Sequence, residues 1–359
     1  MIRPVDHIAS MSGYALAQLS APEGARLISL SQNESLRPPS PLVAEAAAKA
    51  MADGHLYPDP DWQELRQAIS ELKNLQAKDI LCGAGSMDLI AAIAVAFADE
   101  SRAILTSEHA YPFFRTAAQL ARARYDTAPE RELTVSVEAL LEAVRPDTAL
   151  VFVANPANPT GTRISRAELL RLRGGLPDSV LLVIDEAYGE FGDHLGEPLF
   201  DLVNRGDTVV LRSFSKAYGL AGARVGWGLF PPAIAHEVRK VMAPNNISAA
   251  SQAAAVAAVR DQAYVLETCA ITASLRTFFC ERAMRLGLEV TESHTNFVLM
   301  RTGSADRARR IDQYLRDKGI ILRAQGGVGL ADCLRLTIGS EDDLSLTADL
   351  LGAFAREEG

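Results

Sequence analysis

The stretch TVVLRSFSKAYGLAGARVGW, residues 208–227, joins an apolar run to a polar segment that carries a single lysine. The run is rich in β-branched side chains, which favour a buried strand. Lys216 then lies among serine, alanine, glycine and tyrosine, whereas lysines usually occupy solvated faces. Taken alone, such a lysine is more often a surface residue whose aliphatic stem lies along the protein. A functional role can therefore be inferred only from the residues around it.

Similar apolar runs occur along the first two thirds of the chain, and helix-like segments separate several of them. One such segment is ISRAELLRLR (164–173), in which Ser165 and Glu168 have capping-box spacing. Continuous apolar strands separated by helices are typical of a mostly parallel sheet covered by helices on both faces. The sequence therefore predicts an α/β fold, from the runs RAILT (102–106), ALVFVAN (149–155), VLLVIDEA (180–187) and TVVLRSF (208–214).

The chain is predicted to have three parts. Residues 1–36 are irregular and form an N-terminal arm, and residues 37–260 hold the alternating pattern and form a large domain. Beyond residue 260 the pattern changes to a long helical stretch (262–285) followed by short strands and two more helices. We expect residues 261–359, with part of the arm, to form a smaller α+β domain.

Two helix starts are predicted near the beginning of the large domain. Ser40 and Pro41 suit the N-cap and first position of a helix over 41–52. Asp61, with a glutamate three residues later, predicts a capping box at the start of a helix over 61–74.

Composition excludes several classes of protein. The net charge of −9 argues against a nucleic-acid-binding surface. The six histidines show no metal-binding spacing and the four cysteines form no CxxC pair, so we expect no metal and reduced thiols. No apolar run is long enough to cross a bilayer, and the N-terminal sequence lacks the apolar core of a signal peptide. These features predict no membrane partner and a cytoplasmic location.

Polar residues follow three of the predicted strands. ALVFVA runs into NPANPTG with Asn158, VLLVI runs into Asp185 and Tyr188, and TVVLR runs into Ser213 and Lys216. Individually, Asn158 suits a turn, Asp185 suits a helix cap about as well as a site, and Tyr188 suits packing. Because the carboxyl ends of parallel strands meet at one edge of a sheet, we expect all of these groups to lie around one crevice.

This set of groups suits one kind of chemistry. A lysine amine becomes a nucleophile when burial or neighbouring cations lower its pKa, and it can then form a Schiff base with an aldehyde. An aldehyde-bearing cofactor with a pyridine ring needs a buried acid beside its ring nitrogen, a role that suits Asp185. Asn158 and Tyr188 suit the phenolic oxygen of such a ring, and Tyr111 could stack on its face.

A phosphate group on this cofactor would need an arginine, hydroxyls and a helix N-terminus. GAGSMDLIAA (83–92) is a glycine-rich turn that opens a helix, so the amides of Ser86 and Met87 could face the phosphate. Ser213 and Arg224 could complete that site. The glycine-rich turn alone is weak evidence, because an ordinary helix start looks similar.

The motifs NPTG (158–161), DEAY (185–188) and SFSK (213–216), with an arginine eight residues beyond the lysine, resemble the pyridoxal-phosphate aminotransferases of fold type I. Within that family the chain is most similar to the histidinol-phosphate aminotransferase group. The resemblance implies an aspartate-aminotransferase-like fold and pyridoxal 5'-phosphate as cofactor. It extends over nearly the whole chain, through SQNES (31–35), LYPDPD (56–61), HTNFVLMR (294–301), GIILR (319–323) and CLRLTIG (333–339).

The resemblance implies a role for each matching residue. Lys216 would be the Schiff-base lysine and proton shuttle, and Asp185 would pair with the pyridine nitrogen. Asn158 and Tyr188 would hold the phenolic oxygen. Tyr57 would reach the phosphate in the partner subunit of a homodimer. The phosphate in its own subunit would be surrounded by Ser86, Met87, Ser213, Ser215 and Arg224.

The implied substrates are a small amino donor and a keto acid. Arg335 would bind an acidic group of the substrate, carboxylate or phosphate, and Asn33 would also contribute to the substrate site. Arg323 would be either a second anionic contact or part of a surface salt bridge. The implied reaction is transamination of an amino acid or an amino-alcohol phosphate resembling histidinol phosphate, with glutamate and 2-oxoglutarate as the other pair.

Two segments depart from the family's usual pattern. Residues 33–41 read NESLRPPSP where the family has something close to NENPYGPSP, and AQGGVGLADC (324–333) lacks bulky groups that could hold an imidazole. An aromatic or other amino-acid substrate therefore stays open. A decarboxylase of the threonine-phosphate type is the alternative reaction, because the same lysine and aspartate would serve it.

Overall fold

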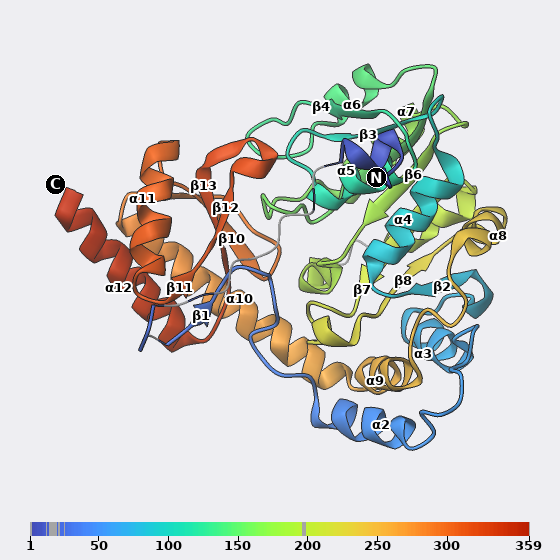
Figure 1. Cartoon of the computed structure of the whole chain (residues 1–359), viewed down its shortest axis with the longest axis horizontal. Coiled ribbons are helices and arrows are strands. Elements are labelled where there is room, and N and C mark those ends of the chain that lie inside the picture. The colour runs from blue at the N-terminus through green and yellow to red at the C-terminus, as the bar shows by residue number, and fades with distance from the viewer. Residues whose placement is uncertain are drawn as a thin grey trace.

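The structure, a computed structural model, describes residues 2–11, 13, 20, 22–24, 26–195 and 199–358. Figure 1 shows a large central sheet with helices packed around it and a separate, smaller sheet with further helices beside it. The N-terminal and C-terminal ends of the chain lie on different sides of this arrangement (Figure 1).

The central sheet has seven strands in the order β2-β8-β7-β6-β5-β3-β4. Strands β3 to β7 run parallel to one another, and β8 is antiparallel to both of its neighbours. Helices flank this sheet, so the predicted mostly parallel α/β architecture is confirmed. The strands are β2 (Ile80–Gly83), β3 (Ala103–Ser107), β4 (Tyr125–Ala128), β5 (Thr148–Ala154), β6 (Leu181–Asp185), β7 (Thr208–Ser213) and β8 (Gly226–Leu229).

The central strands are almost fully buried, because apolar side chains on both of their faces pack against helices. Helix α4 lies next to both α5 and α8, α6 lies next to α7, and α2 lies next to α9. The helices of this part are α2 (Pro41–Met51), α3 (Gln63–Lys73), α4 (Ser86–Phe97), α5 (Pro112–Leu120), α6 (Val137–Ala143), α7 (Arg166–Gly175), α8 (Pro232–Val241) and α9 (Ala249–Arg260). A short helix, α1 (Asp6–Ala9), lies near α5.

A second hydrophobic cluster lies around the smaller sheet, whose strand order is β12-β13-β10-β9 and whose pairs are all antiparallel. The N-terminal segment joins it, because β1 pairs with β11 in parallel and Ile28 and Leu30 belong to this cluster. The domain boundaries at residues 36 and 260 stay a prediction. The elements are β1 (Ile28–Ser29), α10 (Gln262–Arg285), β9 (Glu289–Val290), β10 (Phe297–Arg301), α11 (Ala305–Arg316), β11 (Ile320–Ile321), β12 (Arg323–Gln325), β13 (Leu330–Thr337) and α12 (Glu341–Glu358).

The helix caps agree with the sequence in two cases of three. Ser40 and Ser165 accept hydrogen bonds from the first-turn amides of α2 and α7, as predicted. The capping box at Asp61 is wrong, because α3 begins at Gln63. The carboxylate of Asp59 accepts from the Gln63 amide (2.6 Å), while the carboxylate of Asp61 bonds Arg66 instead.

Candidate active site

The carboxyl ends of β5, β6 and β7 meet at one edge of the central sheet, as the parallel pattern predicted. Ala154 pairs with Asp185, and Asp185 pairs with Leu211, two residues before the end of β7, so the three strands end close to one another. A cavity of about 570 Å³ opens there. Every predicted site residue except Tyr57 lines it: Asn33, Ser86, Met87, Tyr111, Asn158, Asp185, Tyr188, Ser213, Ser215, Lys216, Arg224, Arg323 and Arg335.

Lys216 is half-buried at the wall of this cavity. Its Nζ donates a hydrogen bond to the Asn33 carbonyl oxygen (3.1 Å) and lies 5.7 Å from the centre of the Tyr188 ring. Desolvation lowers the pKa of Lys216 to about 8, and the positive charges of Arg335 and Arg224 act in the same direction. A larger share of this amine is therefore uncharged near neutral pH than for an exposed lysine.

Asp185 is the buried acid of the cavity, with 4% of its surface exposed. Burial raises the pKa of its carboxyl group to about 7, and a hydrogen bond from the Ala187 amide (3.1 Å) opposes that rise. The nearby charge of Glu186 also raises this pKa, and that of Lys216 lowers it. A positively charged group placed beside Asp185 would favour its ionised form.

Tyr188 and Lys216 are both held by Asn33, which comes from the N-terminal segment. The Asn33 side chain donates to the Tyr188 hydroxyl (2.8 Å), and its backbone amide donates to the Thr337 hydroxyl (2.9 Å). Asn33 has a left-handed backbone (φ 56°), a conformation that asparagine tolerates better than most residues. These contacts occupy much of the Asn33 polar surface, and its part in substrate binding stays a prediction.

A polar cradle lies at the N-terminus of α4. Gly85 precedes the helix with φ 86°, and a Cβ atom there would come 2.6 Å from Nη2 of Arg224. Arg224 Nη1 also donates to the Ser215 hydroxyl (3.3 Å), and the Ser213 hydroxyl accepts from the Ser215 amide (3.1 Å). The helix N-terminus, the guanidinium and the hydroxyls together suit an anion with several oxygens.

Two arginines of the smaller sheet face the cavity from the other side. Arg323 on β12 and Arg335 on β13 are directly opposite each other in the antiparallel register. Arg335 is 8% exposed and donates to the Asn158 side-chain oxygen (2.6 Å) and the Ser31 carbonyl (2.8 Å). Two guanidinium groups side by side favour a bound carboxylate or phosphate.

The remaining predicted residues differ in their surroundings. The Tyr111 ring packs edge-on against Phe114 with the ring centres 5.7 Å apart, and Tyr111 lines the cavity just before α5. Tyr57 lies outside the cavity and is 89% exposed.

Some lining residues were not predicted from the sequence, among them Ser31, Glu34 and Gln325. Ser31 and Glu34 lie within two positions of the predicted Asn33, and Gln325 lies two residues beyond Arg323. Their chain proximity to predicted residues was the available signal. Asn155, which also follows β5, bonds the backbone of Ile164 through both side-chain atoms and so shapes the loop.

The described residues offer neither a metal site nor a membrane span. Within them, no group of three or more His, Cys, Asp or Glu residues could hold a metal ion. No helix among them has the length and apolarity needed to cross a membrane.

Known proteins resemble this chain over its whole length. The histidinol-phosphate aminotransferases of Hyphomonas neptunium and Rhodospirillum centenum are 39% and 40% identical to it, over 98% and 97% of this chain and 97% of each relative. The crystal structure of histidinol-phosphate aminotransferase from Sinorhizobium meliloti in complex with pyridoxal-5'-phosphate is 30% identical. It superimposes with a TM-score of 0.92 and covers 100% of this chain and 99% of that one.

The fold is shared more widely. A mutant aspartate aminotransferase of Thermus thermophilus is only 20% identical, yet it superimposes with a TM-score of 0.84 over 99% of both chains, which supports the aspartate-aminotransferase-like fold. The sequence profile described as "Aminotransferase class I and II" matches residues 25–350. This chain therefore belongs to the class I and II aminotransferase family.

Proposed function

We propose that this protein catalyses pyridoxal-phosphate-dependent transamination of an amino donor with an anionic group, of which histidinol phosphate is the first candidate. One observation carries the proposal: Lys216, Asp185 and Arg335 line the same cavity although they come from distant parts of the chain. Relatives that are 39% and 37% identical over 98% of this chain are named histidinol-phosphate aminotransferases, so a decarboxylase of the threonine-phosphate type is not favoured.

The residues present fit pyridoxal 5'-phosphate. Ser86, Met87, Ser213, Ser215 and Arg224 are proposed to hold its phosphate in the cradle at the start of α4. A Cβ atom at position 85 would fill that cradle beside the guanidinium. Asp185 is a buried carboxylate whose ionised form needs a positive partner, which suits a protonated pyridine nitrogen. Asn158 and Tyr188 are proposed to contact the phenolic oxygen, and Tyr111 the ring face.

When bound, this cofactor supplies an aldehyde that reacts with amines and a ring that withdraws electrons from the α-carbon of the substrate. The protein then has to bind the substrate and move one proton. Arg335, with Arg323 beside it, is proposed to hold the anionic group and so orient the α-carbon toward Lys216. The Lys216 amine, with its pKa lowered to about 8, accepts and returns the α-carbon proton near neutral pH.

A donor screen tests the proposal. The purified protein, supplied with pyridoxal 5'-phosphate and 2-oxoglutarate, is incubated with histidinol phosphate, phenylalanine, tyrosine or glutamate. We expect glutamate to form fastest with histidinol phosphate. Release of carbon dioxide without glutamate formation would instead identify a decarboxylase. If an aromatic amino acid gave glutamate faster than histidinol phosphate did, that amino acid would be the preferred donor.

Changing Arg335→Lys is expected to lower kcat/KM for the preferred anionic donor by about 10²-fold, because an ammonium group cannot bind an anion through two parallel hydrogen bonds. Steady-state kinetics measure this loss. Arg301→Gln is the matched control, because Arg301 also lies in the smaller sheet, on β10, but is exposed and outside the cavity. Equal losses in the two variants would contradict a substrate role for Arg335.

Changing Gly85→Ala is expected to weaken binding of pyridoxal 5'-phosphate about tenfold or more. The alanine would be strained at φ 86°, and its Cβ would press on the Arg224 guanidinium. Titration of the cofactor-free protein with pyridoxal 5'-phosphate measures the apparent Kd. Gly206→Ala is the control, because Gly206 has φ 90° but a Cβ atom added there would meet no atom within 4 Å. That variant should lose about 1 kcal/mol of stability and keep its cofactor affinity.

The active form is proposed to be a homodimer in which Tyr57 reaches the phosphate site of the partner subunit. Tyr57 lies outside the cavity of its own subunit, and it is exposed, as are Leu56 and Met51 in the preceding six residues. Large exposed apolar side chains gathered in one segment are typical of a protein interface. We also propose a cytoplasmic location, because all four cysteines are unpaired.

A further inference from the structure

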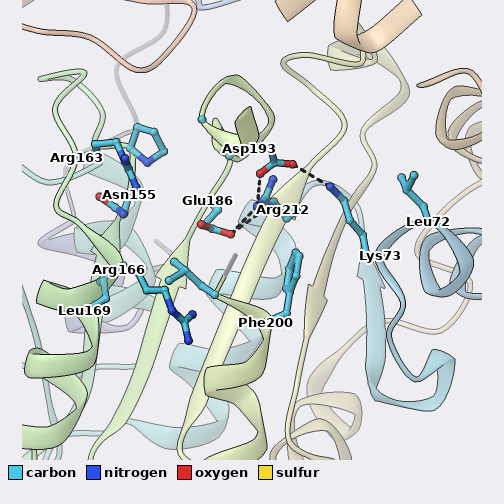
Figure 2. A pocket seen from close by; sticks show the side chains of 14 residues that line it. Leu72, Lys73, Asn155, Arg163, Arg166, Leu169, Glu186, Asp193, Phe200 and Arg212 are labelled. Atoms are coloured by element: carbon cyan, nitrogen blue, oxygen red, sulfur yellow. Dashed lines mark hydrogen bonds and ion pairs between the residues drawn. The ribbon is translucent and has the colours of Figure 1, made fainter. Parts of the chain in front are cut away.

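A second cavity, of about 380 Å³, lies next to the one that holds the candidate active site, and Pro156 lines both. Figure 2 shows that its wall carries a cluster of charged side chains around Arg212. The described residues of this cluster are Lys73, Glu186, Asp193 and Arg212, with Glu190 adjoining them. None of these residues lines the active-site cavity.

Arg212 and Glu186 are nevertheless chain neighbours of active-site residues. Arg212 precedes Ser213 on β7, and Glu186 follows Asp185 at the end of β6. Successive side chains of a strand point to opposite faces of the sheet. Ser213 and Asp185 therefore face the active-site cavity, while Arg212 and Glu186 face the second one.

The loop that follows β6 is folded around the Arg212 guanidinium. Arg212 Nε donates to Glu186 (2.9 Å), Nη1 donates to Glu190 (3.2 Å), and Nη2 donates to Asp193 (2.9 Å). Each donor nitrogen thus holds a different point of one eight-residue segment. Lys73 at the end of α3 also bonds Asp193 (2.9 Å), which ties the far end of the loop to α3 (Figure 2).

Packing around this arginine is close. Arg212 is 1% exposed, and its guanidinium lies 5.3 Å from the centre of the Phe200 ring. The loop backbone passes so near that a Cβ atom at Gly189 would collide with the guanidinium. Gly189 directly follows Tyr188, so the backbone that carries Tyr188 rests on the arginine. A smaller or displaced side chain at position 212 would leave buried carboxylates without their partner and release this loop.

We propose that Arg212 is a positioning residue. It holds Asp185 and Tyr188 in the active site by fixing the loop that follows β6, as far as Asp193. It does this from the opposite face of the sheet and without touching substrate or cofactor. The inference rests on the proposed function, because it concerns the two residues assigned to the cofactor ring.

Arg173 provides a matched control for the experiment. It is also fully buried, but it lies at the opposite ends of the same two strands. Its Nη1 donates to the Val180 carbonyl just before β6 and to the Asp207 carbonyl just before β7. Arg173→Lys and Arg212→Lys therefore remove the same buried guanidinium from opposite edges of the sheet, and only the second adjoins the active site.

The experiment compares these two variants with the wild type, each stripped of cofactor and titrated with pyridoxal 5'-phosphate. Arg212→Lys is expected to weaken the apparent Kd for cofactor and to lower kcat, each by about 10- to 100-fold, with a smaller change in KM. It should also shift the pH at which the absorbance of the bound cofactor changes. Arg173→Lys should lower the melting temperature without these effects. Glu186→Gln, which keeps the side-chain shape, gives a second measurement should Arg212→Lys fail to fold.

The outcomes are distinguishable. The positioning role would be overturned if Arg212→Lys or Glu186→Gln matched Arg173→Lys in cofactor affinity, in kcat and in pH response. The proposed function would then remain intact. A wild-type protein that binds no pyridoxal 5'-phosphate would overturn the proposed function, and this inference with it.

Discussion

Changing Lys216→Ala is expected to lower kcat by about 10⁴-fold or more, because it removes both the amine that joins the cofactor and the group that moves the substrate proton. The cofactor should still bind, since the groups around its phosphate are unchanged. Two measurements check this result: the initial rate of glutamate formation, and the mass of the protein after reduction with borohydride. The wild type should retain one cofactor mass, attached at Lys216, and the variant should retain none.

Lys240→Ala is the control for this experiment. Lys240 lies on α8, where its amine bonds Glu237 on the protein surface, so its removal should change neither the rate nor the retained mass. A Lys216→Ala variant with wild-type turnover, or one that still gains the cofactor mass on reduction, would contradict the assigned role. The lysine at the cavity wall would then need another explanation for its lowered pKa.

The positions of several candidate site residues could be predicted because local sequence patterns determine them. Each apolar run that becomes one of the strands β5, β6 and β7 ends at or just before a polar residue, and the parallel arrangement brings these ends together. Asp185 and Ser213 were predicted in this way. The family resemblance then added residues from the smaller sheet, such as Arg335, whose approach to the cavity depends on long-range packing.

Other features could not be predicted because they depend on contacts between distant segments. The hydrogen bond from Asn33 to the Tyr188 hydroxyl joins residues 155 positions apart, and no local pattern indicates it. The surroundings of Arg212 could not be predicted either, because an arginine inside an apolar strand does not indicate which carboxylates will form ion pairs with it. The incorrect cap at Asp61 shows the same limit on a small scale, because Asp59 satisfies the helix amide from an unexpected position.

The buried charges of the site lower the stability of the cofactor-free protein. Desolvation disfavours the charged forms of both Lys216 and Asp185, which moves the pKa of the lysine down and that of the aspartate up. Proteins commonly retain such unfavourable groups only where function needs them. Binding of a cofactor with a cationic ring would relieve this cost at Asp185, so cofactor binding and folding stability should be coupled.

Changing Asp185→Asn should accordingly have opposite effects on activity and on stability. We expect kcat to fall by about 10²- to 10³-fold, because the ring nitrogen loses its charged partner, while the cofactor stays bound through its phosphate. The cofactor-free variant, however, should be more stable than the cofactor-free wild type at pH 8. Asparagine can still accept the hydrogen bond from the Ala187 amide, and it carries no charge to be buried.

The direction of the pH effect follows from the pKa of Asp185. This pKa rises from 3.8, the ordinary value for an aspartate, to about 7 in the folded protein. Between these values the folded state keeps a proton that the unfolded chain releases, so wild-type stability falls as the pH rises through this window. The full loss, present above pH 7, is on the order of 4 kcal/mol as an upper limit. Asp185→Asn should remove this loss, so the two proteins should differ little near pH 4 and most at pH 8.

Urea unfolding of the cofactor-free proteins at pH 4.5 and pH 8 measures this difference. Asp201→Asn is the control with the opposite sign, because the hydrogen bond from Arg166 lowers the pKa of Asp201 and its ionised form is the favourable one. That variant should gain no stability at pH 8. If the free energies of unfolding of Asp185→Asn and wild type changed with pH in parallel, the carboxyl group would not be the buried acid that the cofactor ring requires. Normal turnover of the variant would lead to the same conclusion.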